Sequence, residues 1–288
     1  NISRAFLDTN GAKQTTSVHV AAPKKAAYFD TPCVEEEKIA HNWKEAWLSN
    51  MGRLNVASQK GLVKRFDSTI GAGTVLMPFG GKYQLTPAEA MAAKVPMLQG
   101  ETTTATLMSY GYQPEIAKWS PFHGAVYAVV ESAAKIVASG GKLESIRLTF
   151  QEYFEKLGTD PEKWGKPFAA LVGAFQAQME LGIAAIGGKD SMSGTFMDLH
   201  VPPVLTSFAV DVTKMDQIIS PELKQADNLL FFLPMKRDEK DLPDYDYARK
   251  LFSLVHGLIE KKVCVSAHTV RGGGLAEAIA KMTFGNKI

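Results

Sequence analysis

The sequence predicts an α+β fold. Two long segments, residues 121–139 and 167–181, have the apolar character of buried helices. A serine–proline pair before the first segment and two glycines after it are typical of helix ends. Short segments with the pattern of strands lie around these helices, at 73–78, 102–107, 143–149, 183–186 and 204–212. The same stretch of chain thus supplies both helices and strands.

Composition and charge indicate an ordinary globular protein. Of the 288 residues, 45% are hydrophobic and 22% are charged, which excludes a disordered or collagen-like chain. The 32 basic and 30 acidic side chains leave a net charge of +2, so we expect no nucleic-acid partner. We expect no membrane partner either, because no apolar run reaches the roughly 18 residues of a membrane span. Cys33 and Cys264 lack the spacing of a disulfide framework or a zinc site, which fits a cytoplasmic protein.

The chain is expected to divide into three parts. Residues 1–61 are predicted to be a linker with a helix at 35–51. A polar stretch near residue 220 separates a domain at 62–220 from the beginning of a second domain at 221–288. Further strands are expected at 61–66, 228–234 and 263–267, and further helices at 245–261 and 275–282. The chain starts with Asn1 and stops soon after the last helix, so we expect a fragment of a longer protein.

A polar stripe runs along the otherwise apolar helix at 121–139. His123, Tyr127, Glu131 and Lys135 are spaced by four residues, so they share one side of the helix. Because the other sides are apolar and predicted to be buried, this side faces a cleft or a partner. Two interpretations stay open. Glu131 and Lys135 form an ordinary i,i+4 ion pair, or Glu131 is a metal or polar ligand in a cleft wall.

The segment GGKDSMSG at 187–194 is the sharpest chemical signal. Its glycines let backbone N–H groups approach an anion, its lysine adds a cation, and its serines add hydroxyl donors. The aspartate can orient an amine or a hydroxyl. The alternative is a polar turn, for which this composition is also good. The candidate residues for a phosphate or ribose-phosphate site are Gly187, Gly188, Lys189, Asp190, Ser191 and Ser193.

Two further turns are weaker candidates. Residues 268–274 place Arg271 in a glycine turn before a helix, which suits an anion site or a plain strand-to-helix connection. Asp67, Ser68 and Thr69 form a second turn. The phosphate fingerprints GxxxxGK[ST] and GxGxxG are absent, and the cysteines and histidines lack metal-site spacing.

Several stretches together resemble one known family. The most specific is IAAIGGKDSMSG at 183–194; the others are RFDSTIGAG at 65–73, PAEA at 87–90, the helix around Glu131, and residues 268–282. In order and spacing they resemble phosphoribosylformylglycinamidine synthase, the amidotransferase of purine biosynthesis. The resemblance covers most of residues 55–288.

The resemblance implies an architecture. The chain would be the second of two tandem halves that resemble aminoimidazole ribonucleotide synthetase. Its synthetase-like N-terminal domain would have one sheet face covered by helices, followed by a truncated, α/β-layered C-terminal domain. The other sheet face would be apolar and exposed, or covered by a homodimer. The implied partners are the first half and the glutaminase domain of the same polypeptide, and neither cysteine takes the amidotransferase role.

The resemblance also implies a reaction. The family converts formylglycinamide ribonucleotide, ATP and glutamine to the amidine through an iminophosphate intermediate, and Mg²⁺ neutralises the phosphate charge. The parent protein would therefore be a carbon–nitrogen ligase that uses ATP and Mg²⁺. The fragment alone is expected to be inactive and to bind neither, while its GGKDSMSG segment contacts the substrate.

The family's auxiliary nucleotide site would be degenerate in this chain. Of its metal ligands only Glu131 is kept, as a vestigial ligand, because Gln99 and Thr269 stand for aspartates and Lys135 for an asparagine. Arg271 stands for a serine. We expect fixed cations to fill the metals' space, leaving no metal site, with Lys135 and Arg271 available to a bare anion. The full set is Gln99, Glu131, Lys135, His268, Thr269 and Arg271.

Two alternatives stay open. The chain is a non-catalytic half that only completes the barrel and the interface, or it is another ATP-dependent synthetase or kinase of the same superfamily, related to the selenophosphate or thiamine-phosphate enzymes. The missing aspartate-rich ATP motif argues against the second.

Overall fold

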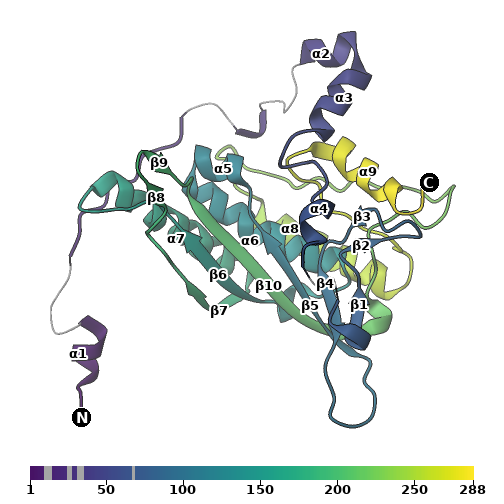
Figure 1. Ribbon diagram of the computed structural model, residues 1–288, viewed down its shortest axis with the longest axis horizontal. Coiled ribbons are helices and arrows are strands. Elements are labelled where there is room, and N and C mark those ends of the chain that lie inside the picture. Colours follow the sequence, from purple (N-terminus) through teal and green to yellow (C-terminus); the bar gives the residue numbers. More distant parts are fainter. Residues whose placement is uncertain (10–14, 25–27, 31–35, 67–68) are drawn as a thin grey trace.

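A six-stranded mixed sheet forms the centre of the protein (Figure 1). The computed structural model describes residues 1–9, 15–24, 28–30, 36–66 and 69–288. The strand order is β1-β4-β5-β10-β6-β7, and all neighbours are antiparallel except β6 and β7. The strands are β1 Thr74–Leu76, β4 Met91–Lys94, β5 Thr104–Gly111, β6 Arg147–Tyr153, β7 Ala184–Lys189 and β10 Val204–Lys214.

Helix α6 (Pro121–Ala138) lies across one face of this sheet. Ser120 caps the helix by accepting a hydrogen bond from the His123 amide, as its position before a proline predicts. The Ser132 hydroxyl lies 2.9 Å from that of Ser207 on β10. A Cβ at Gly111 would overlap the backbone of α6, so only glycine lets the helix come this close. The predicted α+β class and the helix-covered sheet are confirmed.

Helix α7 (Pro161–Leu181) packs beside α6 through small side chains. Gly173 and Ala174 are buried, and a Cβ at Gly173 would overlap the Phe122 carbonyl. Helix α8 (Tyr245–Glu260) adds Ala248 and Phe252 to the same core. One helical layer thus covers the sheet, with all three helices behind the strands in the view of Figure 1.

The opposite face of the sheet is partly apolar and exposed. Met91, Met108, Tyr110 and Val212 all lie on it and are exposed to solvent. The expected apolar patch is therefore present near β4, β5 and β10, whereas β6 contributes polar side chains to the same face.

The N-terminal segment is held on the helical layer at two places. The His19 amide donates to the Pro161 carbonyl at 2.9 Å, at the first residue of α7. The 3₁₀ turn η1 (Tyr28–Asp30) places Phe29 4.9 Å from Tyr127, and the Arg237 guanidinium lies 3.8 Å from the Phe29 ring centroid. The predicted linker is therefore packed against the body at these points.

Shorter elements complete the fold. None of the helices in the described ranges combines the length and hydropathy of a membrane span. The remaining elements are α1 Arg4–Thr9, α2 Glu36–His41, α3 Trp43–Met51, α4 Lys60–Val63, η2 Gly71–Gly73, β2 Phe79–Gly80, β3 Thr86–Pro87, α5 Pro114–Trp119, η3 Leu143–Ser145, β8 Thr195–Phe196, β9 Leu199–His200, η4 Met215–Gln217 and α9 Gly274–Phe284.

Three predicted strands do not form. Residues 61–66 instead belong to α4 and the turns after it, because the Leu62 and Val63 amides bond to the carbonyl of Gln59. Residues 228–234 and 263–267 are irregular, and neither segment pairs with a strand in the described part of the chain. A strand needs a neighbouring strand to pair with as well as suitable residues. Composition alone therefore predicted strands that do not form there.

Helix boundaries also differ from the predictions. The helix expected at 35–51 divides into α2 and α3 at Asn42, whose side chain accepts from the Glu45 amide at 3.2 Å; residue 35 lies outside the described residues. Helix α7 begins six residues earlier than expected, because Asp160 caps it by accepting from the Glu162 amide at 2.9 Å. Side chains that bond the local backbone decide both boundaries.

Candidate functional site

The GGKDSMSG segment lies at the edge of the sheet. Its first three residues belong to β7, so the strand expected at 183–186 continues to Lys189. Beyond it, the Ser191 amide donates to the Glu152 carbonyl at 3.2 Å and the Ser191 carbonyl accepts from the Phe154 amide at 2.9 Å. The segment is therefore an extended edge that follows β6, rather than the polar turn considered as its alternative.

The polar side chains of this segment are accessible. Lys189 and Asp190 are exposed, and the hydroxyl oxygens of Ser191 and Ser193 lie 2.8 Å apart. A cation and two hydroxyl groups thus lie close together along the chain on an open edge, where a phosphate can reach them.

A second carboxyl group lies beside Asp190. Burial, together with the charge of Asp190, raises the pKa of Glu152 to about 7. One oxygen of the Glu152 carboxyl is buried without a hydrogen-bond partner. Above about pH 7, an ionised Glu152 therefore adds a second negative charge beside Asp190.

The two glycines of this segment differ in their surroundings, which predicts different effects of substitution. A Cβ at Gly188 would lie 2.7 Å from the Phe150 carbonyl oxygen, whereas a Cβ at Gly187 would meet nothing within 4 Å. We expect Gly188→Ala to destabilise the fold by about 1–3 kcal/mol, as overpacking does, and Gly187→Ala to leave it unchanged. Urea unfolding of the two variants measures this difference. Equal stabilities would mean that β7 does not pack on β6 as described.

A buried charge cluster forms where the turn at 268–273 meets the sheet and α6. Glu89, just before β4, is buried and accepts two hydrogen bonds from Thr269, one from the amide at 3.0 Å and one from the hydroxyl. The Arg271 Nη2 atom donates to the other Glu89 oxygen at 3.3 Å. Burial alone would raise the pKa of Glu89, but the charge that His268 gains at acid pH, together with the charges of Arg271 and Lys135, lowers it to about 2.

His268 is an uncharged member of this cluster at pH 7. Its Nδ1 atom lies 2.7 Å from the Thr269 carbonyl and therefore carries the proton of the neutral ring. Burial lowers its pKa, against the opposing charge of Glu89, so the ring is neutral at pH 7. Arg271 keeps its charge because Glu89, Glu131 and Glu277 together outweigh the cost of its burial and raise its pKa. Arg271 is therefore the cation that balances Glu89.

Glu131 of α6 is the second carboxylate of this cluster. Its Oε1 atom lies 2.7 Å from Lys135 Nζ and 3.9 Å from Arg271 Nη1, and its Oε2 atom accepts from Gln113 at 2.7 Å. Lys135 Nζ also donates to the Tyr110 carbonyl at 2.8 Å. Both carboxylates and both cations are thus engaged with each other, and the Arg271 Nε atom is buried without a hydrogen-bond partner.

Neighbouring elements hold the turn in place. The carbonyls of Gly272 and Gly273 accept from Arg53 and Asn50 at 2.9 and 2.8 Å, near the end of α3. The Gly273 amide donates to Glu277 of α9 at 2.8 Å. The backbone of the turn is therefore fixed from both sides.

The structure brings together five of the six residues expected at the auxiliary site, namely Glu131, Lys135, His268, Thr269 and Arg271. Gln99 does not join them. It is exposed in the loop between β4 and β5, which extends below the sheet in Figure 1. Of the weak turn candidate, Asp67 and Ser68 lie outside the described residues, and the Thr69 hydroxyl accepts from the Gly71 amide at 3.3 Å.

Sequence reasoning gave no role to Glu89 or Gln113, although both bond directly to the cluster. Glu89 had one signal, as a single carboxylate in the small and apolar stretch PAEAMAA at 87–93. A charge in such a stretch needs a buried partner. Gln113 had none.

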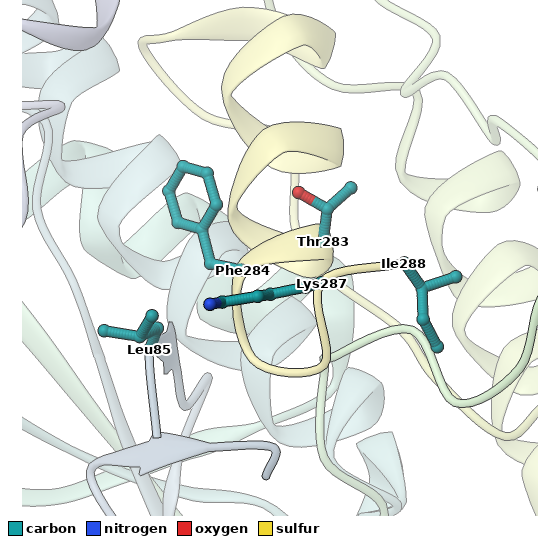
Figure 2. A pocket seen from close by; sticks show the side chains of 5 residues that line it. All are labelled: Leu85, Thr283, Phe284, Lys287 and Ile288. Atoms are coloured by element: carbon teal, nitrogen blue, oxygen red, sulfur yellow. The ribbon is translucent and has the colours of Figure 1, made fainter. Parts of the chain in front are cut away.

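A separate hollow of about 390 Å³ lies beside α9, lined by Leu85, Thr283, Phe284, Lys287 and Ile288 (Figure 2). Its lining is mainly apolar, and Lys287 is engaged with the ring of Tyr83, 4.1 Å from the centroid. It contains none of the predicted site residues.

Comparison with known proteins gives a consistent picture. The PurL subunit of phosphoribosylformylglycinamidine synthase from Symbiobacterium thermophilum is 27% identical over 276 residues, covering 84% of this chain and 35% of that protein. The subunit from Thermoplasma volcanium is 26% identical over 264 residues, covering 84% and 33%. No family model matches the chain.

Solved structures show the same fold. T. maritima PurL complexed with AMPPCP superimposes with a TM-score of 0.54 at 15% identity, covering 85% of this chain and 34% of that one. T. maritima PurL complexed with ATP gives a TM-score of 0.51 at 17% identity, covering 71% and 30%. The chain spans about a third of the length of the curated relatives it matches. Over most of its length, this chain is similar in sequence to PurL subunits of phosphoribosylformylglycinamidine synthase, and it shares its fold with T. maritima PurL.

Proposed function

We propose that this chain is one part of a cytoplasmic ligase that converts formylglycinamide ribonucleotide, ATP and glutamine to formylglycinamidine ribonucleotide, ADP, phosphate and glutamate. The similarity to PurL subunits over 84% of the chain supports this reaction for the parent protein. Ammonia would displace phosphate from an iminophosphate made with ATP and Mg²⁺. A first synthetase-like half and a glutaminase domain would supply the catalytic nucleotide site and the ammonia, so the isolated chain is expected to be inactive.

The share of this chain would be contact with the substrate. The observation that carries this assignment is the open edge of β7, where the exposed Lys189 is followed two residues later by Ser191, whose hydroxyl lies 2.8 Å from that of Ser193. A phosphate or ribose-phosphate is the ligand class that this combination suits, because all three side chains donate hydrogen bonds.

The charge cluster favours a second candidate, a purely structural role at the former nucleotide site. Lys135 Nζ lies 2.7 Å from the only carboxylate that matches the family's metal ligands, Glu131. Mg²⁺ requires oxygen ligands in octahedral geometry, and an ammonium with a guanidinium at this place repels it. The residues do not fit a magnesium-nucleotide, so we assign no nucleotide step to this chain.

Binding of formylglycinamide ribonucleotide separates the two candidates. We expect the chain to bind it, and Lys189→Ala to weaken binding about fivefold or more, which corresponds to about 1 kcal/mol, the usual net contribution of one hydrogen bond. Lys142→Ala, at an exposed lysine elsewhere, should leave binding unchanged. Isothermal titration of formylglycinamide ribonucleotide into the unmodified chain and into each variant, at pH 6 and pH 8, measures these affinities. Mg-ATP is titrated separately.

Equal affinities of the Lys189→Ala variant and the unmodified chain would exclude this segment as the phosphate site. Failure of both ligands to bind would leave the structural role. Tight binding of Mg-ATP would contradict the degenerate nucleotide site.

A further inference from the structure

The outer face of α7 carries an uncovered apolar stripe. Phe168, Leu171, Val172, Phe175 and Met179 recur at the spacing of one helix face, and their exposed fractions are 51, 55, 40, 61 and 67%. The segment from 167 to 179 contains no charged residue. The outer face of a helix is ordinarily polar, and contiguous exposed apolar surface marks an interaction site. These five residues are the α7 stripe.

Helix α1 and the residues before it expose large apolar side chains to solvent. The helix has six residues, of which Phe6 and Leu7 are 51 and 63% exposed, and Ile2 just before it is 67% exposed. In Figure 1 it lies away from the sheet and the helical layer. Helices shorter than roughly 12 residues are marginal in water without tertiary packing, so α1 needs a surface.

The segment that connects α1 to α7 is long enough for α1 to reach the α7 stripe. His19 is bonded to Pro161 at the first residue of α7, and the Gly165 backbone packs against His19. Thr9 precedes His19 by ten residues, which extend to about 35 Å at most. At 1.5 Å per residue, Met179 is about 27 Å from Pro161 along the helix axis. Every part of the α7 stripe is therefore within reach of α1 of the same chain.

We propose that α1 docks on the α7 stripe of its own chain and covers it. A tether of this length gives the intramolecular contact a high effective concentration, which a second copy lacks. The nearby open sheet face is a poorer surface, because β6 presents Arg147, Thr149 and Gln151 there. The inference is independent of the ligand assigned to the β7 edge.

Hydrogen exchange of the α1 amides tests this docking. In the unmodified chain we expect these amides to exchange at least about tenfold more slowly than in an unstructured peptide. Phe175→Glu on the stripe and Phe6→Glu on α1 should each remove that protection. Leu54→Glu is the matched control, because Leu54 is 88% exposed and lies outside the stripe. Unchanged exchange of the α6 amides shows that each variant is folded.

Three results would overturn the proposal. The α1 amides could exchange without protection in the unmodified chain, or their protection could survive Phe175→Glu. Protection that rises with protein concentration, together with a dimer mass by light scattering, would assign the stripe to a second copy instead.

Discussion

Replacing Glu89 with glutamine is expected to lower the free energy of unfolding by about 3 kcal/mol, the low end of the range for breaking a buried ion pair. The substitution keeps the shape and an oxygen for Thr269, but it leaves Arg271 without its main counter-charge. Arg271 is only 21% exposed, and its other ion-pair partner, Glu131, lies 3.9 Å away and already holds Lys135. Urea unfolding at pH 7 measures the change.

The effect of Glu89→Gln on the free energy of unfolding should depend on pH. The Glu89 pKa falls from 4.5 to about 2 on folding, so its contribution is fully present above pH 4.5 and is lost as the pH falls toward 2. The stability difference between the unmodified chain and Glu89→Gln should therefore shrink within that window. It should stay constant between pH 6 and pH 8, where Glu89 is ionised in both the folded and the unfolded chain.

The control for this prediction is the same substitution at an exposed pair. Glu144 lies 3.9 Å from Lys142, and both side chains are more than half exposed. Exposed pairs contribute about 0–1 kcal/mol, so Glu144→Gln should have little effect. A loss below about 1 kcal/mol for Glu89→Gln as well would show that Glu89 does not anchor the cluster.

Local signals explain what the sequence could predict. Ser120 before α6 and Pro121 at its first position mark its start, and the spacing of Glu131 and Lys135 places them as an ion pair on one side. Both features act within a few residues, where capping and helical periodicity decide the structure. The α+β class follows from these helices and from the strands around them.

Long-range partners explain what the sequence could not predict. Glu89 and Thr269 are 180 residues apart, and no periodicity links them. The resemblance placed Gln99 at the position of a metal-binding aspartate, whereas Glu89 provides the carboxylate beside the turn. The segments 228–234 and 263–267 have strand-like composition, but pairing depends on neighbours that composition does not reveal.

Removing the two cations of the cluster should create a binding site for a divalent cation. In Lys135→Asn/Arg271→Ser, the carboxylates of Glu89 and Glu131 lose the groups that now balance them. Arg271 contacts both carboxylates, so they lie close to a common point, and hard cations such as Mn²⁺ prefer oxygen ligands. Without metal, the variant should unfold more easily than the unmodified chain because two buried charges repel.

Thermal unfolding with and without Mn²⁺ measures this binding as a change in stability. At a Mn²⁺ concentration of about 100 times the dissociation constant, binding stabilises the folded state by about 2.7 kcal/mol. For a chain of this size, we expect the melting temperature of the double variant to rise by several degrees, and that of the unmodified chain to stay unchanged. Lys135→Asn alone, which keeps Arg271 between the two carboxylates, should gain less.

The matched control is Lys281→Asn on α9. Lys281 is also a buried lysine in an i,i+4 pair, but its partner Glu277 is a single carboxylate. Its removal therefore exposes no carboxylate pair, and Mn²⁺ should not stabilise that variant. Equal stabilisation of the unmodified chain by Mn²⁺ would show that Lys135 and Arg271 do not block a cation. A double variant that folds and is not stabilised by Mn²⁺ would show that Glu89 and Glu131 cannot share one ion. Too few oxygen ligands, rather than the cations Lys135 and Arg271, would then exclude a metal.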